Sequence, residues 1–208
     1  MRAPARVTLL ADPASGPVTA TGPVTSVQEA EIELPADAFH ELWRAHHLER
    51  LARAYWRFLS KATLGLVRVV YAPDSRTVVL LTRSLPLLRF RRPDYAAGRG
   101  VGQVTWRIER GLLVARSGRG RGFLRITVRA LEAGPELARL RVSCEVASFY
   151  PALRGGGRFA RLGALLYSAT QLRIHVWVTR GFLRSLERFD IIASSMDELA
   201  GPRPLGRP

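Results

Sequence analysis

The stretch from Gly157 to Arg188 constrains the fold more than any other part of this 208-residue chain. It contains no proline, and its apolar residues recur at spacings of three and four, the pattern of one helix face. The members of this apolar stripe are Leu162, Leu165, Leu166, Ala169, Leu172, Val176, Leu183 and Leu186. A helix of this length extends for roughly 45 Å. It therefore needs a broad apolar surface to pack against, and the preceding chain has to supply it.

Segments that alternate between apolar and polar residues precede this stretch, and such alternation is the period of a β-strand. Short turn-like sequences separate most of them, so neighbouring strands are expected to pair antiparallel. One face of these strands is apolar and the other carries many arginines, which predicts a sheet covered on one side only. The expected strands are 26–34, 64–71, 77–82, 85–91, 101–109, 112–130 (two strands or one bent strand) and 138–149.

Two short helices are expected between the first strand and the others. In the first strand we assign Val27 to the apolar face and Gln28 to the polar face. A proline ends this strand, and Asp37 then caps the first helix. The segment 45–47 is expected to form a bend, and the second helix is expected over 47–61.

The chain is strongly basic, with a formal net charge of +15 from 32 Lys and Arg against 17 Asp and Glu. Only one basic residue, Lys61, is a lysine, so codon usage in a GC-rich genome accounts for part of the arginine count. The remaining excess favours anionic partners such as nucleic acid or phospholipid headgroups. The arginines on the polar faces of the expected strands are the candidates for such contacts: Arg107, Arg125, Arg129, Arg139 and Arg141.

We expect one domain over 25–199, preceded by a leader over 1–24 and followed by a disordered tail over 200–208. The leader is rich in small residues and proline, which indicates a flexible segment or an additional edge strand. The chain has no apolar run long enough to span a bilayer and no signal-peptide core, which favours a cytoplasmic protein. The single cysteine, Cys144, provides no disulfide framework and is interpreted as a small core residue.

His175 lies mid-helix beside the apolar stripe, where an imidazole could orient a ligand carbonyl or act as a base. The other histidines lack the spacing of a helical metal site, so neither a metal nor a cofactor is expected. Arg154, Arg158 and Arg161 surround the expected start of the long helix, whose free N–H groups suit a phosphate or carboxylate. The glycine-rich segment 155–160 follows an antiparallel sheet, so it does not meet the requirements of a dinucleotide-binding loop.

The element order is a strand, two short helices, an antiparallel meander and one long C-terminal helix. This order resembles the helix-grip fold of the START and Bet v 1-like (SRPBCC) superfamily, over residues 26–199. The resemblance implies an α+β protein whose curved antiparallel sheet of about six to seven strands wraps around the long C-terminal helix. The segment 48–71, LERLARAYWRFLSKATLGLVRVVY, is also similar to uncharacterised actinobacterial proteins.

The resemblance further implies an apolar cavity between sheet and helix, because members of the superfamily bind lipids, sterols, polyketides or quinones. We therefore expect binding of a hydrophobic or amphipathic small molecule rather than catalysis. One alternative is a cyclase- or dehydratase-like enzyme that uses His175, Tyr71 or Tyr167 as acid or base. Another is arginine-mediated association with nucleic acid or an anionic membrane. The residues expected to form the core or the cavity wall are Trp106, Ile108, Leu124, Ile126, Val142, Cys144, Leu165, Ala169, Leu172 and Val176.

Overall fold

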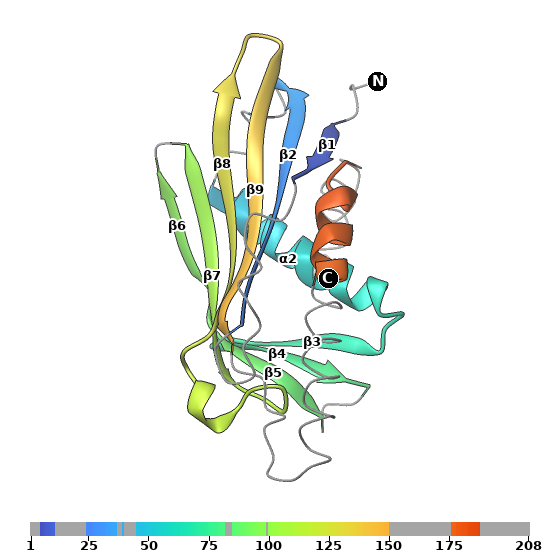
Figure 1. Ribbon diagram of the computed structural model, residues 1–208, viewed down its shortest axis with the longest axis vertical. Helices are drawn as coiled ribbons and strands as arrows, with labels where there is room; N and C mark the ends of the chain where they lie inside the picture. The colour runs from blue at the N-terminus through green and yellow to red at the C-terminus, as the bar shows by residue number, and fades with distance from the viewer. Residues whose placement is uncertain are drawn as a thin grey trace, which may run out of the picture.

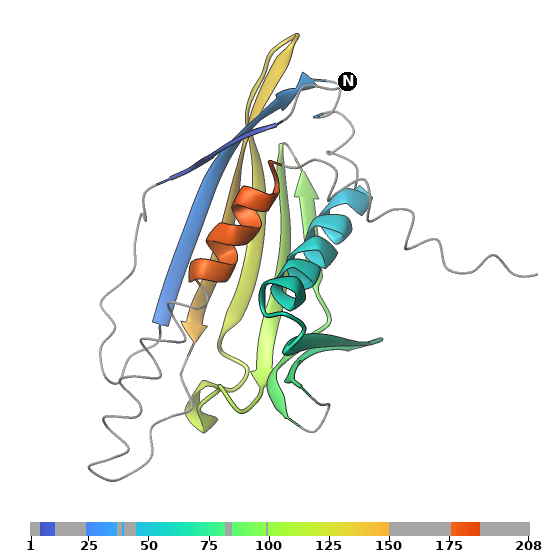
Figure 2. The ribbon, with the colours of Figure 1, turned by 90° about the vertical axis from the view of Figure 1, so that its right-hand side faces the viewer.

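One large antiparallel sheet with two helices along one of its faces makes up the described part of this α+β protein (Figures 1 and 2). The helices are α2 (Ala45–Ala62) and a second helix over 176–185, called the C-terminal helix below. Both lie on the same side of the sheet, next to each other (Figure 2). The computed structural model describes residues 5–10, 24–36, 39, 45–81, 85–98, 100–149 and 176–187.

The sheet contains nine strands within these residues. Their spatial order is β1-β2-β9-β8-β7-β5-β4-β3, and β6 pairs with β7 outside this path. Every neighbouring pair is antiparallel, as the short connections predict. The strands are β1 (Arg6–Leu9), β2 (Val24–Pro35), β3 (Val67–Ala72), β4 (Ser75–Leu80), β5 (Pro86–Arg91), β6 (Asp94–Gly98), β7 (Val101–Arg110), β8 (Phe123–Ala133) and β9 (Leu137–Phe149).

The first long strand, β2, pairs with the last strand, β9, so that Ala30 lies opposite Val142 and Leu34 opposite Ala138. This pairing places β2 inside the sheet, and the short β1 then forms the edge beyond it. Figure 1 shows that β3, β4 and β5 bend across one end of the longer strands. The sheet is therefore concave towards the two helices, which lie in the bend.

Aromatic side chains of α2 join the two helices to the sheet. The ring of Trp56 lies with its centroid 5.2 Å from that of Trp106 on β7 and 5.3 Å from that of Phe90 on β5. The neighbouring ring of Tyr55 meets Phe182 of the C-terminal helix edge-to-face, with 5.2 Å between centroids. Such tilted and edge-to-face contacts stabilise a core beyond the area that they bury. All five residues are buried, so α2 is a central core element.

The sheet has more strands than the six to seven that the sequence suggests. Residues 6–9 of the expected leader form β1, which pairs with β2. Residues 94–98 form β6, which lies outside every strand expected from the sequence. The small residues of β6 conceal any alternation, and pairing with β7 supplies the strand instead. Conversely, part of the expected strand 112–130 is irregular and contains the 3₁₀ helix η1 (Arg116–Gly118), so β8 begins only at Phe123.

Two local expectations are wrong. The segment 45–47 is the first turn of α2 rather than a bend, because the helix already packs on the sheet through the buried Leu48. In β2 the inward face is set by strict alternation from the apolar residues Ala30, Ile32 and Leu34. That alternation turns Gln28 inward, where it is buried, and leaves Val27 on the opposite face.

Much of the expected long helix lies outside the described residues, which include only 176–187 of the stretch 157–188. Within these, Leu183 and Leu186 of the apolar stripe are buried and Val176 is half-buried. Residues 11–23 of the leader and the whole tail from 200 to 208 are also outside the described part. Neither of the helices that the structure describes is long and apolar enough to cross a membrane.

Candidate functional site

Six of the residues predicted to form the core or the cavity wall lie on the concave face of the sheet. They come from three adjacent strands, and all are buried: Trp106, Ile108, Leu124, Ile126, Val142 and Cys144. Strict alternation along β7, β8 and β9 accounts for this common orientation. Val176 lies on the C-terminal helix, and three further predicted residues, Leu165, Ala169 and Leu172, are outside the described residues.

Polar side chains interrupt this apolar packing where the C-terminal helix meets β2. Nε of Arg180 donates a hydrogen bond of 2.8 Å to Oε1 of Gln28. The amide of Gln28 in turn donates to the carbonyl oxygen of Val27 at 2.9 Å. Cys144 of β9 is the residue directly opposite Gln28 in the sheet. We call this group the polar seam, and its members are Ser26, Gln28, Tyr55, Cys144, Thr179 and Arg180.

Two hydroxyl groups of the polar seam are buried without a hydrogen-bond partner among the described residues: Ser26 Oγ and Thr179 Oγ1. The indole Nε1 of Trp56, next to Tyr55 on α2, is in the same situation. Leaving a buried polar group unsatisfied costs about 1–3 kcal/mol, so a native protein rarely does so without a reason. The two hydroxyls come from β2 and the C-terminal helix, whereas the Trp56 ring packs farther along the sheet, against Trp106 of β7 and Phe90 of β5.

Two titratable groups of the polar seam, Tyr55 and Cys144, are held neutral. Burial raises the pKa of the Tyr55 hydroxyl above its ordinary value of 10.0, and the nearby Cys144 thiol raises it further. The Thr179 hydroxyl partly offsets this rise, although its oxygen makes no hydrogen bond of standard geometry. Burial also raises the pKa of Cys144 above 9.0. The Tyr55 hydroxyl therefore acts as a neutral donor or acceptor, and Cys144 is an inert core thiol.

Sequence reasoning does not single out Thr179, Ser26 or Gln28, yet a signal for each exists. The apolar stripe of the C-terminal helix passes from Val176 to Leu183, and helical spacing places Thr179 between them on the same face. The period of two in β2 carries the inward face back to Gln28 and Ser26. Thr179, Ser26 and Gln28 are thus recognisable as polar residues at inward positions of otherwise apolar patterns.

The candidates for acid–base chemistry do not gather on the concave face. Tyr71 lies on β3 with its side chain half exposed and the guanidinium of Arg76 5.0 Å from its ring centroid. Its pKa is raised, mainly by partial burial. His175 and Tyr167 are outside the described residues, as are the proposed anion ligands Arg154, Arg158 and Arg161. Within the described ranges, no group of three or more His, Cys, Asp or Glu could hold a metal ion.

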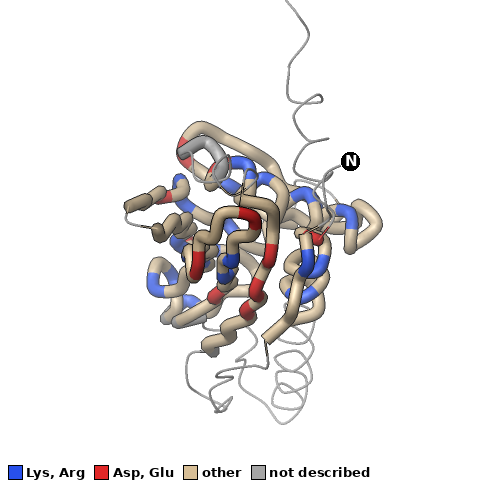
Figure 3. Tube along the Cα trace, turned by 90° about the horizontal axis from the view of Figure 1, so that it is seen from above, with Lys and Arg blue, Asp and Glu red and all other residues tan. Residues whose placement is uncertain are grey.

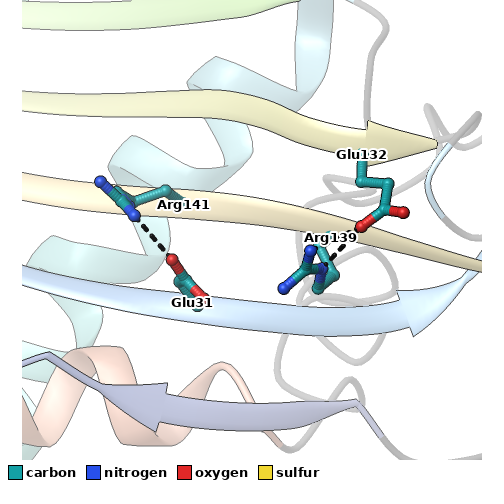
Figure 4. Close-up of polar contacts among 4 residues, drawn as sticks. All are labelled: Glu31, Glu132, Arg139 and Arg141. Atoms are coloured by element: carbon teal, nitrogen blue, oxygen red, sulfur yellow. Dashed lines mark hydrogen bonds and ion pairs between the residues drawn. The ribbon is translucent and has the colours of Figure 1, made fainter.

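The arginines predicted on the outer face of the sheet are largely engaged by glutamates of neighbouring strands (Figure 4). The ion pairs are Arg141 with Glu31 at 2.6 Å, Arg139 with Glu132 at 2.6 Å and Arg125 with Glu145 at 3.3 Å. Arg125 also lies over the ring of Phe123, 4.4 Å from its centroid. Opposite charges on adjacent strands are typical cross-strand pairs. This face is therefore a mixed-charge surface, which disfavours it as a nucleic-acid platform.

Comparison with solved structures finds matches of low similarity. Norcoclaurine synthase from Thalictrum flavum, in complex with dopamine and hydroxybenzaldehyde, is 15% identical with a TM-score of 0.31, covering 92% of this chain and 98% of that chain. Human STARD10 is 8% identical with a TM-score of 0.27, covering 95% of this chain and 83% of that chain. No protein-family profile matches the sequence, and no curated protein matches it. Similarities of this size assign neither a ligand nor a reaction to the chain.

Proposed function

We propose that this protein binds one hydrophobic or amphipathic small molecule between the concave face of the sheet and the helices that cover it. The observation that carries the proposal is the set of buried, unpartnered polar atoms Ser26 Oγ, Thr179 Oγ1 and Trp56 Nε1 within an apolar interior. Small-molecule sites have this composition: mostly apolar walls with a few polar groups that fix the orientation of the ligand.

The chemistry of these atoms defines the ligand class. The two hydroxyls suit a carbonyl, hydroxyl or ether oxygen at one part of a ligand, and the indole N–H of Trp56 suits a second acceptor farther along the sheet. The aromatic residues suit a flat or aliphatic body. A lipid, polyketide or quinone meets this description. Arg154, Arg158 and Arg161 are the proposed holders of an anionic headgroup, on the basis of their clustering in the sequence. Burial raises the pKa of both Tyr55 and Cys144, so neither serves as a base near neutral pH.

Native mass spectrometry of the full chain, followed by titration with a dansyl-labelled fatty acid and with a naphthoquinone, tests this proposal. The informative variant is Thr179→Val, which keeps the side-chain shape and removes only the hydroxyl. We expect its free energy of unfolding to stay equal or rise by up to about 1 kcal/mol, since an unsatisfied polar group is removed. Ligand affinity should fall about fivefold, as expected for one lost hydrogen bond.

Thr127→Val is the matched control, because Thr127 lies on the opposite face of β8 from the buried Ile126 and Val128. It should leave the affinity unchanged. If the full chain takes up neither probe and carries no bound molecule after purification, the proposal is wrong. If wild type and Thr179→Val bind the probe with equal affinity, the polar seam does not contact the ligand.

A further inference from the structure

Five exposed leucines lie together at the end of the molecule that β3, β4 and β5 form, and we call them the leucine rim. Backbone hydrogen bonds connect the segments that carry them. The amide of Leu81 donates to the carbonyl of Leu66 at 2.7 Å, and the amide of Leu80 donates to that of Leu85 at 3.0 Å. The rim consists of Leu64, Leu66, Leu81, Leu85 and Leu112, the last joined through its amide to the carbonyl of Pro86 at 3.0 Å.

Leu64 occupies a backbone position at which glycine is the favourable residue. It follows α2 with φ 52°, and the amide of Gly65 donates to the carbonyl of Ser60 while the amide of Leu64 donates to that of Lys61. These two bonds form a Schellman motif, whose left-handed residue is usually glycine. The Leu64 side chain is 91% exposed, so it contributes almost nothing to the core. Neither the backbone conformation nor core packing therefore favours a leucine at position 64.

Leu81 repeats this combination on the neighbouring turn. Its φ is 56°, and its side chain is 56% exposed. Among the described residues, Leu64 and Leu81 are the two non-glycine residues with positive φ. Backbone strain in a native structure is commonly held at functional positions. Two strained, exposed and adjacent leucines indicate a surface that is retained for contact with another body.

The surroundings of the leucine rim are basic. The segment 57–92 contains eight Lys and Arg and a single acidic residue, Asp74. The segment 110–121, which includes Leu112, adds four arginines and no acid. The nearby Glu109 is paired with Arg89 at 3.1 Å. Exposed basic side chains on these two segments include Lys61, Arg68, Arg110, Arg116, Arg119 and Arg121.

The opposite end of the molecule differs in charge. Figure 3, viewed from the end of the β8–β9 hairpin, shows several acidic positions among basic ones. They include Glu31 and Glu33 of β2 and Glu132 and Glu136 of the hairpin. The fold thus separates a basic, apolar end from an end of mixed charge, where Glu31 and Glu132 pair with Arg141 and Arg139. This polarity would orient the molecule in front of a negatively charged surface.

We propose that the leucine rim is a docking surface for an anionic phospholipid bilayer. Aliphatic side chains ringed by basic residues match the interface of such a bilayer, where leucines enter the acyl boundary and cations meet the headgroups. Nucleic acid fits less well, because aliphatic side chains do not provide the aromatic platforms that stack on bases. The site lies on the outer surface, apart from the polar seam, so the proposal stands independently of the proposed ligand.

Co-sedimentation of the full chain with phosphatidylcholine vesicles, with and without phosphatidylglycerol, tests this proposal. We expect at least about tenfold stronger partitioning onto the anionic vesicles, because several basic residues approach their headgroups. Binding should weaken steeply at about 0.5 M salt, where exposed charges are screened. The key variant is Leu64→Gly, which should fold at least as stably as wild type and bind the anionic vesicles about tenfold more weakly.

Leu137→Ser is the control, because Leu137 is a similarly exposed leucine at the end of mixed charge. It should bind the vesicles like wild type. In a second measurement, Leu64→Cys carries an environment-sensitive fluorophore, which is selective because the native Cys144 is buried. Its emission should shift to the blue when anionic vesicles are added.

Each contrary outcome overturns the proposal. If the protein does not bind anionic vesicles, the proposal is wrong. If it binds them but Leu64→Gly binds equally well, the membrane contact lies on another surface. Failure of the fluorophore to attach at position 64 of the folded chain would show that another part of this chain covers the rim. Salt-sensitive binding of duplex or single-stranded DNA without vesicle binding would assign the basic end to nucleic acid.

Discussion

The guanidinium of Arg180 and the amide of Gln28 meet in a 2.8 Å hydrogen bond that joins residues 152 positions apart. Through this bond the C-terminal helix is fixed to β2, the second strand of the sheet. Gln28 is buried, so its amide oxygen has little access to solvent. The bond therefore combines a charged donor with a buried acceptor, which is the stronger kind of protein hydrogen bond.

Gln28→Leu should lower the free energy of unfolding by about 1–2 kcal/mol, because the guanidinium loses this acceptor. Gln28→Glu should retain more stability at neutral pH, since a carboxylate oxygen accepts the same bond with added charge attraction. Urea unfolding of the three proteins measures the difference. If Gln28→Leu is as stable as wild type, the bond has no net role in docking the helix.

The aromatic contacts of the C-terminal helix should dominate its stability contribution. Phe182→Ala removes a buried ring that packs edge-to-face on Tyr55 and also lies 6.2 Å, centroid to centroid, from Phe58. The expected loss in unfolding free energy is about 3–5 kcal/mol. Trp177→Ala is the matched control on the same helix, because Trp177 is exposed, and it should change stability by less than about 0.5 kcal/mol. Similar losses for both variants would contradict this packing.

Gly111 lies where no side chain fits. Its φ is 152°, and a Cβ atom there would lie 2.2 Å from the carbonyl oxygen of Leu87. Because the obstacle is backbone, Gly111→Ala should lower the unfolding free energy by at least about 2 kcal/mol. Gly98→Ala is the control, since a Cβ atom would meet nothing within 4 Å there. Thermal unfolding should separate the two variants by several degrees, and coincident transitions would refute the close approach.

Stability should decrease at alkaline pH because of two buried groups. The pKa values of Tyr55 and Cys144 are raised in the folded protein above their ordinary values of 10.0 and 9.0. Below about pH 7.5 both states keep these protons, so neither group changes stability with pH. As the pH rises through 9 and then 10, the unfolded chain loses protons that the folded protein retains. Each group then lowers the unfolding free energy by about 1.4 kcal/mol per pH unit.

Urea titrations at a series of alkaline pH values test this dependence. Cys144→Ala should remove the first part of the decline, between the ordinary pKa values of the thiol and the phenol. Its overall stability at neutral pH will be lower because a buried side chain is shortened. The slope with pH is therefore the quantity to compare. An unchanged slope between pH 9 and pH 10 would show that Cys144 is not held neutral by burial.

The elements that sequence reasoning locates best are those whose pattern matches their burial. In β7, β8 and β9, apolar and polar residues alternate strictly, so Trp106, Ile126 and Val142 are correctly assigned to one buried face. β6 is missed because its pairing with β7, rather than its own side chains, makes it a strand. The central role of α2 is missed for a related reason. An amphipathic helix pattern does not reveal that Trp56 will reach across the sheet to Phe90 and Trp106.

The polar seam and the leucine rim show what a single sequence does not reveal. Gln28 and Thr179 are polar residues, and a reading by residue type assigns them to solvent although the backbone turns them inward. The rim requires knowing that the turns after α2 and after β4 are neighbours, which follows from the hydrogen bond between Leu81 and Leu66. The arginines in the sequence predict a basic surface on the outer face of the sheet. In the structure, glutamates pair with three of the five candidate arginines on that face.

The pairing of β2 with β9 also determines when the sheet of this protein can finish folding. Glu31 and Arg141, joined across that pair, are 110 residues apart, so β2 leaves the ribosome long before its inner partner exists. Contacts this distant in sequence require closure of a large loop and slow the folding of sheet proteins. The β7–β8–β9 meander contains only local pairings and is therefore expected to form first. The N-terminal strand then completes the sheet as a late step, after synthesis of β9.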